Sequence, residues 1–407
     1  MKILMLKDYF YPEKCAGITL SLDLVEGFTA KGWETEVFTP IPCRGIDREV
    51  RKQYKRKKIE KIKGAVIHRY WLPYEKSGVI VRAGRYILQN VIQIIKGIFS
   101  KSDIIFLGST PPTMGIVGTI LKKIKKIPFV YNVQDIFPDS LVTSGLTEKG
   151  SILWKIGRKI EDCTYRNADK IIVISDKFKQ NLLEKGVPTN KIVVVSNWIN
   201  LDQVKHIERS QNDLYKELGL SNEDNVVVYA GNCGISQGVD IIIEAAMILP
   251  NIKFVVFGGG SEFDSIKKTV FENGLSNVIV RELLPLDRVS EVYSLGNLAI
   301  ITCKKGVGTS GLPSKTWSIM ACNTPIIASY DLDSDLAKLI NKANAGVCVE
   351  PENVEALASA IESFFSMNML LKAEDKIRNL RAYVENNASK DACVKKYIEV
   401  IEQLGDI

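Results

Sequence analysis

Short apolar segments alternate with helix-like segments along nearly the whole chain. In the first half, six runs rich in β-branched residues predict buried strands at Lys2–Leu6, Glu34–Phe38, Ile104–Leu107, Phe129–Asn132, Lys170–Ile174 and Ile192–Val195. Apolar residues at helical spacing predict helices at Thr19–Lys31, Gly115–Ile124, Ser151–Asn167 and Asp176–Lys185. After the polar stretch His206–Asn225, strands are expected at Val226–Ala230, Lys253–Gly258, Val278–Arg281, Leu298–Thr302, Pro325–Ser329 and Gly346–Val349. This alternation favours βαβ units, in which helices cover both faces of a parallel sheet.

The length of 407 residues and the two successive sets of strands predict more than one domain. We expect an α/β protein with two doubly wound, Rossmann-like domains, at residues 1–203 and 204–388. A last helix, within residues 389–407, is expected to pack back toward the first domain. Ligands of such sheets bind at the carboxyl ends of the strands, so the expected site is a cleft where the two sets of ends face each other.

Charge is concentrated in one segment of the first half. The formal net charge is +7, and Arg44–Lys63 holds ten basic residues against three acidic ones. Close by, Val79–Phe99 is apolar at helical spacing. A basic stretch beside an amphipathic helix fits a protein lying on an anionic membrane, whereas a core helix beside a basic surface loop is the alternative. Nucleic acid is not an expected partner, because aromatic residues are not interleaved with the charges.

The remaining composition excludes several classes of site. Eight cysteines are scattered without a Cys-x-x-Cys pair, which disfavours a zinc site and a disulfide framework and suits a reducing cytoplasm. The two histidines give little support to a metal site or a Ser-His-Asp triad. The apolar run after Met1 is too short for a signal peptide, and no run is long enough to span a bilayer. We therefore expect no metal and no cofactor, and a cytoplasmic protein that is soluble or peripheral on the inner face of the membrane.

The segment Gly308–Pro325 carries the strongest chemical signal. It follows an expected strand, contains small flexible residues and a single lysine, Lys315, and then becomes compatible with a helix. Backbone N–H groups and the positive end of a helix meet at such a turn, and Lys315 adds a full charge, so the segment predicts an anion site. An ordinary strand-to-helix turn is the alternative.

Three other loops follow expected strands. Ala230–Gly238 contains Gly231, Asn232, Gly234 and Gln237, which suits a diphosphate or another polar ligand. Gly17 ends a loop after the first strand, where a ligand can approach the backbone closely. Asp135 follows the strand at Phe129–Asn132, where a carboxylate can accept a proton or a hydrogen bond from a hydroxyl, or can serve as a turn or helix-cap residue.

The ordered set of these motifs resembles a family over essentially the whole chain. The chain is similar to family 4 glycosyltransferases of the GT-B fold, and especially to the branch typified by N-acetyl-L-fucosamine transferases of bacterial surface polysaccharide synthesis. The resemblance rests on segments at Asp8–Gly17, Asp135–Asp139, Ala168–Ser175, Val194–Asn200, Tyr229–Gly238, Val255–Gly260, Leu312–Lys315, Met320–Ser329 and Ala345–Val347.

The resemblance implies roles for both domains. The second would bind a nucleotide-sugar donor, most readily a UDP-sugar, and the first an acceptor such as a polyprenyl diphosphate-linked sugar or an oligosaccharide. Transfer in the family retains the anomeric configuration and generally needs no metal. The implied donor-binding residues are Gly17, Gly231, Asn232, Gly234, Gln237, Glu282, Leu283, Ser310, Ser314, Lys315, Thr316 and Ser318, with Asp135 and Lys315 as the implied catalytic residues.

Departures from the family pattern keep other functions open. The wider family has a pair of glutamates where Ser310 and Ser318 stand, and Arg and Lys on the diphosphate where Asn232 and Gln237 stand. Asn, Gln and Pro-Ser-Lys315 resemble the fucosamine-transferase branch, but Ser318 does not. A serine offers the ribose a weaker hydrogen bond than a carboxylate. The alternatives to a retaining transferase of capsule or O-antigen synthesis are a non-hydrolysing UDP-sugar 2-epimerase and a catalytically impaired nucleotide-sugar-binding subunit.

Overall fold

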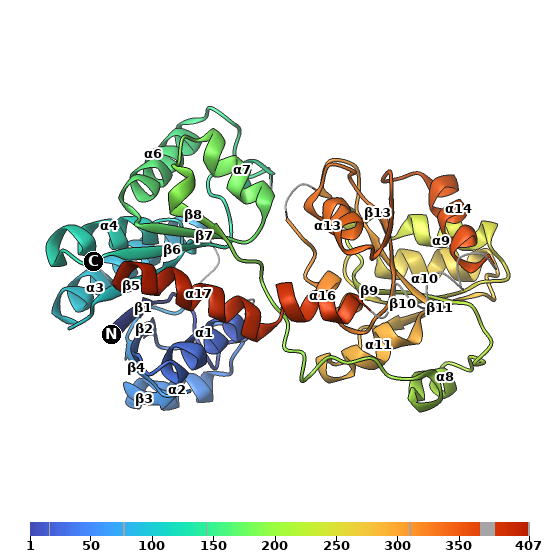
Figure 1. Cartoon of the computed structure of the whole chain (residues 1–407), viewed down its shortest axis with the longest axis horizontal. Coiled ribbons are helices and arrows are strands. Elements are labelled where there is room, and N and C mark those ends of the chain that lie inside the picture. Colours follow the sequence, from blue (N-terminus) through green and yellow to red (C-terminus); the bar gives the residue numbers. More distant parts are fainter. Residues whose placement is uncertain (16, 76–77, 144, 309–310, 367–378, 406–407) are drawn as a thin grey trace. The chain divides into compact units, whose positions relative to one another are not determined.

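The computed structural model describes the chain except residues 16, 76–77, 144, 309–310, 367–378 and 406–407. It divides into two compact units (Figure 1). The first unit comprises Met1–Ser196 and Cys393–Ile407, and the second comprises Asn197–Ala392.

An eight-stranded sheet forms the centre of the first unit, in the order β3-β4-β2-β1-β5-β6-β7-β8. Neighbouring strands run parallel except β3, which is antiparallel to β4. The strands are β1 (Lys2–Leu6), β2 (Glu34–Pro40), β3 (Ile59–Ile62), β4 (Ala65–Tyr70), β5 (Ile104–Gly108), β6 (Phe129–Val133), β7 (Lys170–Val173) and β8 (Ile192–Val194). The central strands are apolar on both faces, as a parallel sheet covered by helices requires.

Helices from both ends of the chain cover this sheet. They are α1 (Ile18–Ala30), α2 (Arg48–Arg56), α3 (Val79–Phe99), α4 (Met114–Lys125), α5 (Asp139–Thr143), α6 (Ile152–Asn167), α7 (Asp176–Glu184), η1 (Thr189–Lys191) and α17 (Lys390–Gly405). From α17, Tyr397 is fully buried; its hydroxyl donates to Asn132 Oδ1 at 3.1 Å and its ring packs against Phe106. The last helix thus completes the core of the first unit.

The basic stretch Arg44–Lys63 is structured rather than a solvated loop. It contains α2 and β3, and β3 and β4 form an antiparallel pair that the strand pattern did not predict. Arg51 is buried, and its guanidinium donates to the backbone oxygens of Ile41, Pro42 and Leu72 at 2.7–3.0 Å. At least one charge in this stretch therefore serves the fold, while most of the others are exposed.

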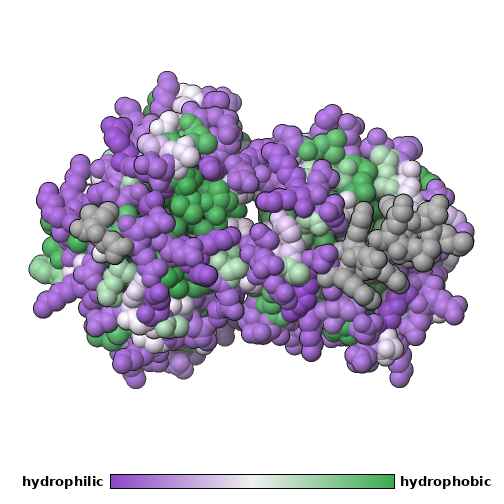
Figure 2. All heavy atoms as spheres, in the orientation of Figure 1, coloured by the Kyte–Doolittle hydropathy of each residue, from purple (hydrophilic) through white to green (hydrophobic). Residues whose placement is uncertain are grey.

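Helix α3 buries several polar side chains and exposes several apolar ones, while Ile92, Ile94 and Ile98 pack against the core. Arg85, Gln89 and Gln93 are buried at successive turns. The opposite face exposes what we call the α3 stripe, which consists of Ile87, Leu88, Val91, Ile95 and Phe99. Figure 2 shows hydrophobic side chains among hydrophilic ones at the edge of the first unit where α3 lies. Within the described residues, no helix combines the length and the apolar character needed to cross a bilayer.

The second unit is built on a six-stranded sheet in which all strands run parallel, in the order β11-β10-β9-β12-β13-β14. The strands are β9 (Val226–Asn232), β10 (Lys253–Gly259), β11 (Val278–Glu282), β12 (Leu298–Thr302), β13 (Ile326–Ser329) and β14 (Gly346–Val349). The connecting helices are η2 (Arg209–Gln211), α8 (Asp213–Glu217), η3 (Ile235–Gln237), α9 (Asp240–Ile248), α10 (Phe263–Glu272), η4 (Leu286–Arg288), α11 (Val289–Leu295), α12 (Lys315–Ala321), α13 (Asp335–Ala343), α14 (Val354–Phe365) and α16 (Leu380–Asn387).

Alternate residues of the β9 strand enter two separate cores. Val226, Val228 and Ala230 pack with α8, α11, α12, α13 and α16, whereas Val227 and Tyr229 pack with α9, α10 and α14. This is the period of two that a strand imposes when helices cover both faces of its sheet. It also fixes where Tyr229 lies, on the face opposite Ala230, just before the loop that leaves β9.

Candidate active site

The loop after β9 is held by its own polar groups. The Tyr229 hydroxyl donates to Asn232 O at 2.7 Å, and Asn232 Nδ2 donates to Gln237 Oε1 at 2.9 Å. The same Gln237 oxygen accepts the Gly234 N–H at 3.2 Å. Gly231 has a φ of 153°, which L side chains rarely adopt. Asn232 and Gln237 therefore hold the loop in shape by their mutual hydrogen bond. Gly231, which has no side chain, leaves room for a neighbouring residue to approach its backbone.

That neighbour is Lys315, the first residue of α12. Its ammonium lies 3.9 Å from the centre of the Tyr229 ring and donates to Ala230 O at 3.3 Å. A Cβ on Gly231 would lie only 3.0 Å from Lys315 Nζ. Burial lowers the pKa of Lys315 from 10.5 to about 8. An ammonium that has lost hydration in this way gains more from a nearby anion than an exposed one does.

A cavity of about 360 Å³ opens beside this lysine, within the second unit. Several residues expected from the sequence meet there, namely Gly231, Asn232, Gln237, Leu283, Ser314 and Lys315. Among its described lining residues, Lys315 is the only one with a charged side chain. The cavity therefore has one positive end, formed by residues from the β9 loop and the start of α12.

The other wall of the cavity is apolar. It is formed by Phe257, Leu284, Pro285, Leu286, Val289, Val292 and Tyr293, from the ends of β10 and β11 and from η4 and α11. Its outermost member, Leu286, is 90% exposed. Such a wall suits a flat, weakly polar group, so the cavity as a whole fits a ligand with an anion at one end and a ring at the other.

Several other expected residues do not line this cavity. Glu282 ends β11 with its side chain exposed, and Thr316 is fully buried, with a hydroxyl that has no hydrogen-bond partner among the described residues. Ser318 is half-buried within α12. Ser310 lies outside the described residues.

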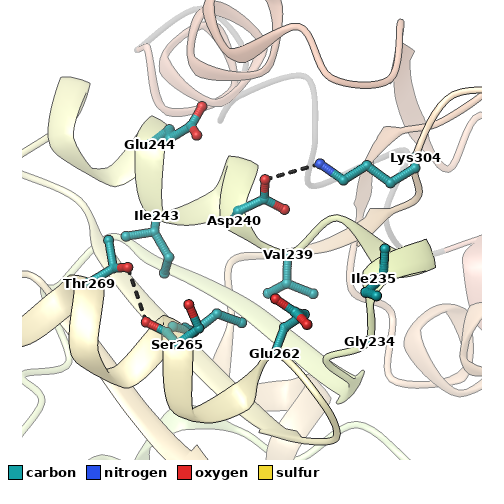
Figure 3. Close-up of a pocket in the computed structure, with 11 residues that line it drawn as sticks. Gly234, Ile235, Val239, Asp240, Ile243, Glu244, Glu262, Ser265, Thr269 and Lys304 are labelled. Carbon is teal, nitrogen blue, oxygen red and sulfur yellow. Dashed lines mark hydrogen bonds and ion pairs between the residues drawn. The ribbon is translucent and has the colours of Figure 1, made fainter.

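Gly234 lines a second cavity of about 360 Å³ (Figure 3). Three carboxylates line it, from Asp240, Glu244 and Glu262, against the single ammonium of Lys304, which pairs with Asp240 at 3.1 Å. The excess of negative charge makes this cavity unsuited to an anion. The glycine-rich loop therefore borders two cavities of opposite charge: the cavity at Lys315 is positive and this one is negative.

The remaining two expected residues lie in the first unit. Gly17 immediately precedes α1 with a φ of 81°, and the position that a Cβ would take there is open, with no atom within 4 Å. Asp135 follows β6; its side chain is exposed, and its backbone N–H donates to Ser109 Oγ at 3.2 Å. The carboxylate is thus presented at the carboxyl end of a central strand.

Comparison with known families accounts for both units. The profile described as "Glycosyltransferase Family 4" matches residues 19–203, and that described as "Glycosyl transferases group 1" matches residues 210–391. The chain consists of a family 4 and a group 1 glycosyltransferase domain.

Two relatives of this glycosyltransferase come from bacteria. A protein of Escherichia coli (strain K12), named as the colanic acid biosynthesis glycosyl transferase WcaI, is 25% identical over 98% of this chain and all of its own length. The Pseudomonas aeruginosa glycosyltransferase WbjE is 26% identical over 66% of this chain and 68% of its own.

Solved structures show the fold of the glycosyltransferase. Sucrose-phosphate synthase from Thermosynechococcus elongatus matches with a TM-score of 0.72, 17% identity and coverage of 99% of this chain and 98% of its own. Anabaena HepE in complex with UDP also matches with a TM-score of 0.72, at 16% identity, over 99% of this chain and all of its own. The expectation of a GT-B fold with two α/β domains and parallel sheets is confirmed.

Sequence reasoning missed two features of the site. Tyr229 was expected in a strand and in a segment of the family resemblance, but not as the ring that the lysine ammonium contacts. The apolar wall from Leu284 to Val289 has neither helical nor strand periodicity, so the pattern gave no reason to place it at a site. The available signal was the run Leu283-Leu284-Pro285-Leu286, which is apolar beyond the end of a strand and therefore needs another surface to contact.

Proposed function

We propose that this glycosyltransferase takes its sugar from a UDP-sugar whose diphosphate is held by Lys315. The observation that carries the proposal is the partly dehydrated ammonium at one end of a cavity whose other wall is apolar. The diphosphate would lie at Lys315, Ser314 and Gly231, and the uracil ring against the apolar wall near Leu283. Structural neighbours solved with UDP and with UDP-glucose support this choice of donor.

Lys315 would act on the leaving group. As the bond between the anomeric carbon and the diphosphate oxygen breaks, negative charge grows on the diphosphate, and a fixed ammonium already stripped of some water stabilises that charge without reorganising. We propose that transfer retains the anomeric configuration, as the family resemblance implies. We also propose that it needs no divalent metal, because Lys315 supplies positive charge where the leaving group departs. The resemblance alone assigns Gly17 to the diphosphate, and it assigns Asp135 to orienting the attacking hydroxyl by accepting its hydrogen bond.

The sugar we propose is of the N-acetyl-fucosamine type. The proposal depends on the resemblance of Asn232, Gln237 and Pro313-Ser314-Lys315 to that branch of the family. The relative named for colanic acid biosynthesis supports a role in bacterial surface polysaccharide synthesis, of capsule or O-antigen. By resemblance alone, Glu282, Ser310 and Ser318 stay assigned to the sugar, ribose or base, and Thr316 to the diphosphate.

The acceptor we propose is a lipid-linked sugar or growing oligosaccharide at the cytoplasmic face of the membrane. The α3 stripe supports this, because an exposed apolar face beside basic residues gains free energy at an anionic bilayer surface. Two further relatives are named as diacylglycerol glycosyl synthases, of Streptococcus pneumoniae and Acholeplasma laidlawii, so their acceptors are lipids by name.

The test begins with donor binding and ends with transfer. UDP, GDP and dTDP and their sugars are screened by the shift in the protein's unfolding temperature, where a ligand at a hundred times its dissociation constant adds about 2.7 kcal/mol to the unfolding free energy. We expect UDP and its sugars to raise the unfolding temperature. We also expect UDP to be released from the donor only when an acceptor is present, and this release should persist in EDTA. Epimerised UDP-sugar without acceptor would instead identify an epimerase, and UDP binding without any turnover an impaired subunit.

A further inference from the structure

Another cavity lies in the first unit, and its lining contains none of the residues assigned to the donor. A cavity of about 460 Å³ is lined by Ile41, Lys55, Lys58, Arg69, Tyr70, Trp71 and Lys96. The lining comes from the ends of β2 and β4, the end of α2 and the flank of α3. Four of these residues are cationic and none is acidic, so the cavity is an anion site by charge.

The cationic side chains of this cavity differ in whether an acidic side chain forms an ion pair with them. Arg69 is buried and is paired with Glu60, yet its Nη1 atom has no hydrogen-bond partner among the described residues. Lys55, Lys58 and Lys96 form no ion pair within the described part of the chain. Three like charges around one cavity repel one another, and an anion among them would relieve that repulsion.

The same cavity adjoins exposed apolar side chains. Lys96 and Phe99 are three positions apart on α3, which puts them about 60° apart around the helix, and Phe99 is 80% exposed. Trp71, at the mouth of the cavity, is 58% exposed. Cationic side chains beside Phe99, at the end of the α3 stripe, and beside an exposed tryptophan suit the boundary between lipid headgroups and acyl chains.

We propose that this cavity binds the phosphate of an anionic phospholipid headgroup while the α3 stripe lies in the acyl boundary. The inference rests on the membrane association proposed above and adds a specific headgroup site to it. Lys55, Lys58 and Lys96 surround the phosphate, and Trp71 lies at headgroup depth. The donor cavity at Lys315 takes no part, so donor binding and headgroup binding are separable.

The experiment uses the full chain and vesicles of phosphatidylcholine with or without phosphatidylglycerol. Trp71 is the reporter: the difference in emission between the wild type and Trp71→Phe isolates its signal, which should shift to shorter wavelength on vesicles that contain phosphatidylglycerol. With about 1 kcal/mol per lysine near an anionic surface, the triple variant Lys55→Ala, Lys58→Ala, Lys96→Ala should partition about a hundredfold more weakly. A matched variant removes three exposed lysines of the second unit, Lys216, Lys338 and Lys342, and should lose less than about threefold, because most of their field is screened.

UDP binding by each variant shows that it is folded and that the donor cavity is intact. Equal losses in the two triple variants would overturn the headgroup site while leaving membrane association in place. Binding of the wild type to neither kind of vesicle would overturn both proposals, but would leave the donor site untouched. Free glycerol phosphate should not reproduce the Trp71 shift; if it did so at the same phosphate concentration, the cavity would be a site for a soluble phosphate compound and the lipid assignment would be wrong.

Discussion

Replacing Lys315 by methionine removes the positive end of the cavity proposed for the donor, while keeping an unbranched side chain of similar length. The ammonium contacts only the Tyr229 ring and Ala230 O among the contacts the structure shows. A diphosphate bound there would make hydrogen bonds to a charged group, each worth about 1.5–3 kcal/mol. We therefore expect UDP to bind roughly 10- to 100-fold more weakly, and the transfer rate to fall by a further factor of about 10² or more.

The same substitution should make the free protein more stable. The pKa of Lys315 falls from 10.5 to about 8 because burial disfavours its charged form, and that lowering corresponds to about 3 kcal/mol of folding free energy below pH 8. The cation–π contact with Tyr229 offsets about 1 kcal/mol of this. Lys315→Met should accordingly raise the free energy of unfolding by about 1–3 kcal/mol at pH 7. The gain should shrink as pH rises from about 8 to 10.5, because the wild-type lysine then loses its proton in the folded state first.

Titration calorimetry measures the affinity for UDP, and urea unfolding at pH 7 and 10 measures the free energy of unfolding of the same protein. Lys304→Met is the control, because Lys304 pairs with Asp240 and Glu352 outside the donor cavity. It should leave UDP affinity unchanged and should not stabilise the protein. If Lys315→Met bound UDP as tightly as the wild type and were no more stable, both the assigned role of Lys315 and its dehydrated state would be refuted.

Three other outcomes follow from the contacts described. Gly231→Ala should weaken UDP binding about tenfold, because the new methyl meets Lys315 Nζ at 3.0 Å and φ is 153°; unchanged affinity in titration calorimetry would contradict this. UDP affinity of the wild type should fall as pH rises above about 8, where free Lys315 loses its proton, and Lys315→Met should show no such decrease. Arg51→Met should destabilise the protein by about 3 kcal/mol in urea unfolding, because three buried carbonyls lose a charged donor, whereas Lys52→Met on the exposed face of α2 should cost almost nothing.

The strands and the glycine-rich loop after β9 were predictable because their signals are local. Apolar, β-branched runs gave the strands from β9 to β14. Of these, β9, β10, β12 and β13 are largely buried, and strands buried on both faces show no polar alternation. The positions of Gly231 and Lys315 followed from loops that leave neighbouring parallel strands, β9 and β12, at one edge of the sheet.

The parts that could not be predicted depend on contacts between distant residues. Helix α2 and strands β3 and β4 were not predicted, because charged residues obscure the apolar pattern of this region. The burial of Arg51 was not predicted either, because it depends on carbonyls of other segments. The periodicity of α3 gave a helix with the bounds Val79–Phe99, but not which face is buried, since Gln89 and Gln93 are fully buried whereas Val91, Ile95 and Phe99 are exposed. The apolar wall around Leu284 is formed where the ends of β10 and β11 meet α11, and the sequence pattern does not show that these elements meet.

The packing of α17 on the first unit has a consequence for how the protein is made. Because Tyr397 and Val394 fill the space beside Phe106, Asn132 and Gly27, the first unit is formed by two segments that are far apart along the chain. During translation, the amino-terminal portion leaves the ribosome without its final helix and must wait for the whole second unit to be synthesised. A fragment expressed as residues 1–196 would therefore expose a vacant apolar groove, and a circular permutant that joins the last helix to Met1 would give this half of the enzyme an uninterrupted chain.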